Sequence, residues 1–126
     1  MTLTTIILLV LTLYMVQIFL QETSHFGFDL RGIMGNRDQL PETSVLAGRL
    51  GRAKNNMLES LPIFLGLALL ALIKGGATSE VTRAASIFLI ARVVYVPAYV
   101  IGVPMLRSLV WLVAVASLVG MALPLI

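Results

Sequence analysis

The sequence predicts an all-α integral membrane protein, built as a four-helix transmembrane bundle. Of its 126 residues, 59% are hydrophobic and only 12% are charged, whereas an ordinary soluble domain is about 25% charged. A soluble fold of this length would have too few polar side chains to cover its surface, and a disordered chain would be far more polar. Four stretches are also long and apolar enough to cross a hydrocarbon core of roughly 30 Å.

The four expected spans cover residues 2–20, 57–73, 84–103 and 109–126, within one domain of residues 1–126. The first span contains no charged residue and lacks both a basic leader and a small-residue cleavage motif, so we expect an uncleaved helix rather than a signal peptide. The second carries one acid, Glu59, and the third one base, Arg92, while the fourth is uncharged.

The connections between the spans are unequal. Residues 21–56 form a long polar loop and a helical stalk, which we expect to begin near Pro41 and to run into the second span. An even number of spans places this loop and the turn before Arg107 on one side of the membrane, with six of the nine basic residues. The positive-inside rule then puts that side in the cytoplasm and both termini outside.

Polar side chains recur on one face of each middle span. At helical spacing, residues i, i+3 or i+4 and i+7 share a face, and two such sets are Arg52, Asn56 and Glu59 on the second helix and Arg92, Tyr95 and Tyr99 on the third. Ionisable groups inside a span usually face the bundle interior or a wet cavity. We expect Glu59 to lie at the depth of Tyr99 and to pair with Arg92, one or two turns deeper; the alternative is that this pair only holds two helices together.

Basic residues are expected to surround the cytoplasmic mouth of this polar seam; they are Arg31, Arg49, Arg52, Lys54 and Arg107. Together with the two tyrosines they indicate a pocket for a small anionic ligand. Arg107 and Ser108 stand at the start of the fourth helix, where a cation beside free backbone amides favours a thiolate or a carboxylate. The alternative is that the basic residues set the topology and contact anionic lipid, an interpretation that we prefer for Arg37 and Lys54.

These motifs resemble those of the MAPEG family, the membrane-associated proteins in eicosanoid and glutathione metabolism. Residues 51–62, G-R-A-K-N-N-M-L-E-S-L-P, are similar to the family signature R-A-x-x-N-x-x-E-x-x-P. Residues 91–99 resemble the third-helix segment of the family, and Arg107-Ser108 resembles the start of its fourth helix. The likeness covers nearly the whole chain and is closest to a bacterial branch, which implies the bacterial inner membrane.

The resemblance implies a homotrimer that binds glutathione as a co-substrate between subunits, near the cytoplasmic face. It assigns contacts with glutathione to Arg52, Asn56, Glu59, Tyr95 and Tyr99. By the same likeness Arg31 lies near the carboxylates of glutathione or the second substrate, and Arg92 pairs with the helix-two glutamate. Arg107, together with Ser108, would stabilise the thiolate, which attacks a lipophilic small-molecule substrate that enters from membrane lipid between helices one and four. The spacing from Tyr99 to Arg107 and the presence of Ser60 and Pro97 depart from characterised members.

Three functions are compatible with these residues. The first is a microsomal-type glutathione transferase or peroxidase, and the second is a non-catalytic MAPEG-fold protein that binds lipid or another small ligand. The third, a small transporter, is less favoured because Glu59, the only acid in the spans, would be neutralised by Arg92. No metal site is expected from a chain with no cysteine and one histidine, and a net charge of +3 gives no indication of nucleic-acid binding.

Overall fold

The computed structural model describes residues 1–25 and 45–126. These residues form four long helices and a final 3₁₀ turn, namely α1 (Leu3–His25), α3 (Val45–Ile73), α4 (Ser79–Ile101), α5 (Pro104–Ala122) and η1 (Leu123–Leu125). Each of the four helices is long and apolar enough to cross a membrane. The expected helix start near Pro41 lies outside the described residues, as do Arg31 and Arg37.

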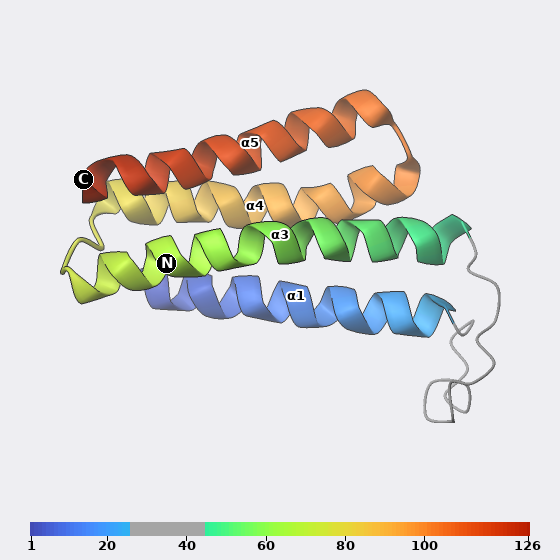
Figure 1. Cartoon of the computed structure of the whole chain (residues 1–126), viewed down its shortest axis with the longest axis horizontal. Coiled ribbons are helices and arrows are strands. Elements are labelled where there is room, and N and C mark those ends of the chain that lie inside the picture. Colours follow the sequence, from blue (N-terminus) through green and yellow to red (C-terminus); the bar gives the residue numbers. More distant parts are fainter. Residues whose placement is uncertain (26–44) are drawn as a thin grey trace.

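The helices lie side by side as an antiparallel bundle (Figure 1). Helix α1 packs on α3, α3 packs on α4, and the most extensive contact joins α4 to α5. The end of α1, the start of α3 and the turn between α4 and α5 share one end of the bundle, while both chain termini lie near the other end. The last turn of α1, the first turn of α3 and the turn before Arg107 therefore lie on the same side of the bundle, as the sequence predicts.

The interior of the bundle combines large aromatic side chains with very small ones. The rings of Phe64 and Phe88 are stacked with their centroids 4.7 Å apart and join α3 to α4. Ala68 and Ala85 are fully buried, and Gly120 of α5 lies against Ala84. Because lipid is as apolar as these side chains, helices in a membrane associate largely through close packing, which small residues permit.

Helix α3 is longer than a membrane crossing requires. Its 29 residues correspond to about 44 Å at 1.5 Å per residue, against a hydrocarbon core of roughly 30 Å. Pro62 lies inside this helix, which continues to Ile73. The excess length places the first turns of α3, including Arg49 and Arg52, near the end of the bundle that holds the α4–α5 turn.

The ends of α4 follow from local chemistry. The Thr78 side chain accepts a hydrogen bond from the backbone N–H of Val81 and caps the first turn. At the other end, Gly102 has a φ of 80° and closes the helix in the left-handed region. Helix α5 begins two residues later at Pro104, five residues before the expected start of the fourth span, because proline suits the first helical position.

Gly102 is the position in this turn where a side chain is least tolerable. Its φ is positive, and an added Cβ would lie 2.8 Å from Nη2 of Arg49, whose Nη1 donates to the Val100 carbonyl oxygen at 2.8 Å. We expect Gly102→Ala to lower the free energy of unfolding by roughly 1 to 2 kcal/mol, measured by thermal unfolding in detergent. The control is Gly66→Ala in α3, where an added Cβ meets nothing within 4 Å; equal stability of the two variants would contradict this role of Gly102.

Candidate functional site

Two adjoining pockets lie where α3, α4 and α5 meet, near the α4–α5 turn. The larger has a volume of about 320 Å³ and is lined by Arg52, Asn55, Asn56, Glu59, Tyr95, Tyr99 and Arg107. The smaller, of about 200 Å³, is lined by Asn56, Tyr95, Arg107, Ser108 and Trp111. Because Asn56, Tyr95 and Arg107 line both, we treat the two as one site, called the polar pocket below.

Tyr99 joins the two cations of the polar pocket. Its hydroxyl oxygen accepts a hydrogen bond from Nε of Arg52 at 3.1 Å. The guanidinium carbon of Arg107 lies 4.9 Å from the centroid of the same ring, a distance that permits a cation–π contact. The Tyr95 ring is 5.7 Å away, centroid to centroid. Tyr99 thereby holds a guanidinium group from α3 and one from α5 around a common space.

Arg92 lies behind the wall of the polar pocket rather than in it. Only 1% of its surface is exposed, and its Nη1 donates to Oδ1 of Asn56 at 2.7 Å. Its Nε donates to Sδ of Met57 at 3.2 Å, and its guanidinium carbon lies 4.3 Å from the centroid of the Tyr95 ring. Arg92 therefore contacts two side chains that line the pocket and supports them from the bundle interior.

The expected Glu59–Arg92 pair is wrong: within residues 1–25 and 45–126, Arg92 bonds to Asn56 and Met57, and Glu59 is exposed. The cause is the register between α3 and α4. Tyr99 lies level with Arg52, not with Glu59, and Arg92 lies level with Asn56 and Met57. Glu59, seven residues after Arg52, consequently lies about two turns deeper than expected, roughly 11 Å, and lines the polar pocket.

The first turn of α5 supplies backbone donors beside Arg107. The N–H of Arg107 bonds to the Val103 carbonyl oxygen at 3.2 Å, so the amides of Met105 and Leu106 come before the first intrahelical bond, where N–H groups have no helical partner. Ser108 is exposed and lines the smaller part of the pocket. A cation, helix amides and a hydroxyl group therefore lie within one turn, an arrangement suited to an anion.

Most of the residues selected from the sequence come together in this pocket. Those that line it are Arg52, Asn56, Glu59, Tyr95, Tyr99, Arg107 and Ser108. Two basic residues expected at its mouth bind elsewhere, since Arg49 donates to the Val100 carbonyl and Lys54 donates to Gln21 at 3.3 Å. Arg31 lies outside the described residues.

Sequence reasoning missed two residues that line the polar pocket, Asn55 and Trp111. Trp111 stands four residues after Arg107, so the helical repeat could have placed it on the same face. Asn55 stands three residues after Arg52 and four before Glu59, so the same repeat could have placed it on that face. Among the described residues, no cluster of three His, Cys, Asp or Glu side chains could hold a metal ion.

The formal charge of the polar pocket is positive. Arg52 and Arg107 line it, Arg92 lies directly behind it, and Glu59 is the only acid among its lining residues. Three arginines and one glutamate leave two net positive charges at the edge of an apolar bundle. Unpaired charges at the edge of an apolar bundle cost free energy. The site is therefore suited to a ligand with net negative charge that also carries one positive group, which Glu59 can bind.

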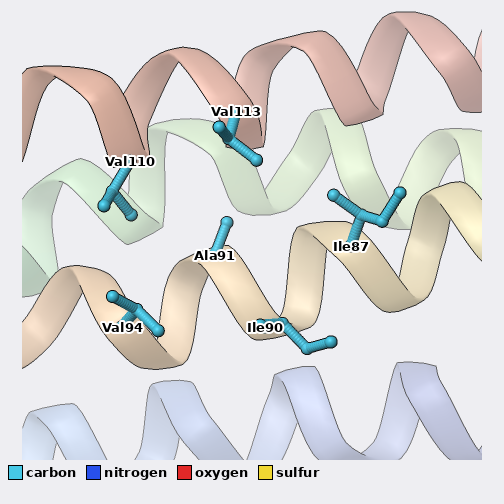
Figure 2. Close-up of a pocket in the computed structure, with 6 residues that line it drawn as sticks. All are labelled: Ile87, Ile90, Ala91, Val94, Val110 and Val113. Carbon is cyan, nitrogen blue, oxygen red and sulfur yellow. The ribbon is translucent and has the colours of Figure 1, made fainter.

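An apolar groove lies one turn deeper, between α4 and α5 (Figure 2). It has a volume of about 210 Å³ and is lined only by aliphatic side chains, Ile87, Ile90, Ala91, Val94, Val110 and Val113. Figure 2 shows Val110 and Val113 on α5 facing the helix that carries the other four. Val94 is next to Tyr95 in the sequence and Val110 is two residues after Ser108, while the groove and the polar pocket share no lining residue.

Comparison with known protein families gave one match. The family model described as "MAPEG family" matches residues 1–126, which is the whole chain. Comparison with curated proteins and with solved structures gave no match. The family match confirms the resemblance found in the helix motifs, and with the four apolar helices it identifies the chain as an integral membrane protein. The chain belongs to the MAPEG family, which includes both glutathione transferases and non-catalytic members.

Proposed function

We propose that the protein is a glutathione-dependent membrane transferase or peroxidase that acts on lipophilic electrophiles. The observation that carries this proposal is the placement of two guanidinium groups, Arg52 and Arg107, against Tyr99 in a pocket that also holds Glu59. Glutathione has two carboxylates, one ammonium group and one thiol. The pocket offers Arg52 for a carboxylate, Glu59 for the ammonium group, and Arg107 for the thiolate.

The charge balance supports this ligand. Glutathione carries one net negative charge with its thiol protonated and two with the thiolate formed. The pocket has two net positive charges, from three arginines and one glutamate. An opposite charge favours the ionised form of an acid, so the pocket favours the thiolate form of the bound ligand.

Arg107 is the residue we assign to the thiolate. A free thiol has a pKa near 8.5, and a nearby cation at a helix N-terminus lowers it. Arg107 lies in the first turn of α5 with the amides of Met105 and Leu106, and the Ser108 hydroxyl group is adjacent. These groups together stabilise the negative sulfur and raise the nucleophilic fraction at neutral pH.

The second substrate is assigned to the apolar groove between α4 and α5 (Figure 2). In conjugation, the thiolate sulfur bonds to an electrophilic carbon, and the displaced electron pair leaves with the departing group. In peroxide reduction, the sulfur attacks a peroxide oxygen, an alcohol leaves, and a second glutathione converts the sulfenic acid to disulfide and water. In this proposal the second substrate approaches from this groove, whose residues Val94 and Val110 are close in sequence to the pocket residues Tyr95 and Ser108, rather than from between helices one and four.

The same proposal includes a homotrimer in the bacterial inner membrane, with the polar pocket at the cytoplasmic face. Large apolar side chains are exposed along α3 and α5, among them Leu58, Ile63, Leu112 and Val119. Neighbouring subunits or lipid would cover them. The basic residues near this end of the bundle support the orientation through the positive-inside rule.

Calorimetric titration of glutathione into the detergent-solubilised protein tests the proposed ligand. We expect saturable binding that Arg52→Gln weakens about tenfold, the usual range for losing a charge-assisted hydrogen bond. Lys54→Gln is the matched control, because it removes the same charge from the same helix at a side chain that contacts Gln21 instead of the pocket. Absence of binding by the wild type, with both variants folded, would show that the chain keeps the family fold for another ligand or none.

A further inference from the structure

Three polar atoms buried inside the bundle have no hydrogen-bond partner within the described part of the chain. They are Nε2 and Oε1 of Gln17 on α1, and Nη2 of Arg92 on α4. Gln17 is 2% exposed and Arg92 is 1% exposed. Buried polar atoms in proteins nearly always have a partner, either protein or ordered water. In the interior of a membrane bundle the requirement is stricter, because bulk water is remote.

Gln17 and Arg92 lie at the same level of the bundle. Lys54 on α3 donates to Gln21 on α1, which fixes the register of these two helices. Gln17 lies about 6 Å deeper than Gln21, and Met57 lies about 4.5 Å deeper than Lys54, at 1.5 Å per residue. Gln17 is therefore level with Met57, whose sulfur accepts a hydrogen bond from Arg92.

Both side chains also face the same interior. Gln17 falls on the buried stripe of α1 that includes Ile6 and Val10, and α1 packs against both α3 and α4. Arg92 projects from α4 toward Asn56 and Met57 of α3. The unpartnered ends of the two side chains therefore converge on one layer, in the space enclosed by α1, α3 and α4.

The chemistry of the two groups decides how they connect. An arginine has five N–H donors and no acceptor, so the partner of Nη2 must be an acceptor, and the unpartnered acceptor in this layer is Oε1 of Gln17. The two atoms are beyond direct hydrogen-bond distance, and a single water can accept from the first and donate to the second. We propose that Gln17 is a positioning residue that holds Arg92 through one buried water.

Arg92, held by Gln17, fixes the orientation of the Asn56 side-chain amide at the polar pocket. Because Nη1 of Arg92 can only donate, the atom of Asn56 that faces it is the carbonyl oxygen, Oδ1. The amide nitrogen of Asn56, which lines the pocket, is then not engaged by Arg92. Gln17 thus keeps two N–H donors of Asn56 available to a carboxylate or carbonyl of the ligand, without contacting that ligand itself.

Thermal unfolding in the absence of ligand tests the proposed water-mediated link between Gln17 and Arg92. If Gln17 holds Arg92, Gln17→Leu lowers the unfolding temperature of the solubilised protein by about 4 to 8 °C, the shift expected for one lost buried hydrogen bond in a small domain. In an Arg92→Met background the same substitution leaves the unfolding temperature unchanged or raises it, since the glutamine then has no cation to hold. An unchanged or higher unfolding temperature for Gln17→Leu in the wild-type background overturns the proposal.

A second variant keeps this test decisive if Gln17→Leu fails to fold. Gln17→Glu keeps an acceptor at the same position and adds a negative charge opposite Arg92. The proposal requires this variant to fold with an unfolding temperature at least equal to that of the wild type. A Gln17→Glu protein as unstable as Gln17→Leu overturns the proposal.

The effect on the pocket rests on the proposed glutathione function and is tested by a double-mutant cycle. Calorimetry with glutathione should show about three- to tenfold weaker binding for Gln17→Leu, and less than a twofold effect of the same change in an Asn56→Ala background. Equal effects of Gln17→Leu in both backgrounds would overturn the link to Asn56. If the wild type binds no glutathione, the proposed function fails, while the stability experiment still decides the connection between Gln17 and Arg92.

Discussion

Replacement of Arg107 by alanine is expected to lower kcat/KM for glutathione conjugation about 100-fold at neutral pH. A loss of this size is usual when an enzyme loses one preorganised group that stabilises a negative charge. The physical reason is that Arg107 is the pocket cation closest to free helix amides, whereas Arg52 is bonded to Tyr99. The measurement is steady-state conjugation of a lipophilic electrophile by the purified protein in detergent.

The pH dependence of this variant distinguishes a lost thiolate site from a general loss of fold. With the proposed function, we expect the thiol of bound glutathione to have a lowered pKa in the wild type, so that the rate rises with pH and levels off below the free value of about 8.5. In Arg107→Ala the midpoint of the pH profile shifts up toward that free value, and the rates of the variant and the wild type become equal at high pH. Arg107→Lys keeps the charge and should lie between them.

The matched control for Arg107→Ala is Arg83→Ala, which removes an exposed arginine near the start of α4, at the opposite end of the bundle. Its rate constant should equal that of the wild type. A folded Arg107→Ala protein with the wild-type rate and the wild-type pH profile would show that Arg107 does not stabilise the thiolate.

Replacement of Arg92 by methionine is expected to weaken glutathione binding without lowering the thermal stability of the protein. Arg92 is 1% exposed and bonds to two neutral side chains, Asn56 and Met57, with a third contact to the Tyr95 ring. A buried cation without an acid is expensive, so an apolar side chain of similar length should leave the thermal stability unchanged or raise it. Glutathione affinity should nevertheless fall about tenfold, since Asn56 is no longer held with its amide nitrogen toward the pocket.

Thermal unfolding and calorimetry on the same preparation measure these two effects. Arg92→Lys serves as the comparison, because it keeps the charge but loses the planar group that reaches Asn56 and Met57 together. It should lose affinity without gaining stability. An Arg92→Met protein that unfolds readily yet binds glutathione as the wild type does would show that Arg92 serves only the bundle.

The helices were predictable because membrane thickness imposes a simple requirement on apolar length. The antiparallel order of four spans also places the α4–α5 turn beside the end of α1. The side-chain sets on α3 and α4 were also predictable, because helical spacing alone decides which residues share a face. The family signature supplied their assignment to glutathione.

The contacts within those sets were not predictable, because they depend on how far one helix slides along the next. The expected register put Glu59 level with Tyr99, but Arg52, seven residues earlier, bonds to Tyr99. This shift of about two turns, roughly 11 Å, replaces the expected Glu59–Arg92 pair by the Asn56–Arg92 bond. The aliphatic groove between α4 and α5 has no sequence signal, since its residues resemble any lipid-facing surface. The role of Gln17 likewise emerges only when two unpartnered atoms are found at one level.

The central claim is that this pocket binds glutathione as a thiolate stabilised by Arg107. The most direct measurement is the ultraviolet difference absorbance of the thiolate, recorded as glutathione is added to the solubilised wild-type protein over a series of pH values. We expect a saturable thiolate signal at neutral pH that titrates well below the free pKa of about 8.5 and that Arg107→Ala removes. Saturable glutathione binding with no thiolate signal below that pKa would contradict the claim, and the MAPEG fold would then hold this ligand without activating it.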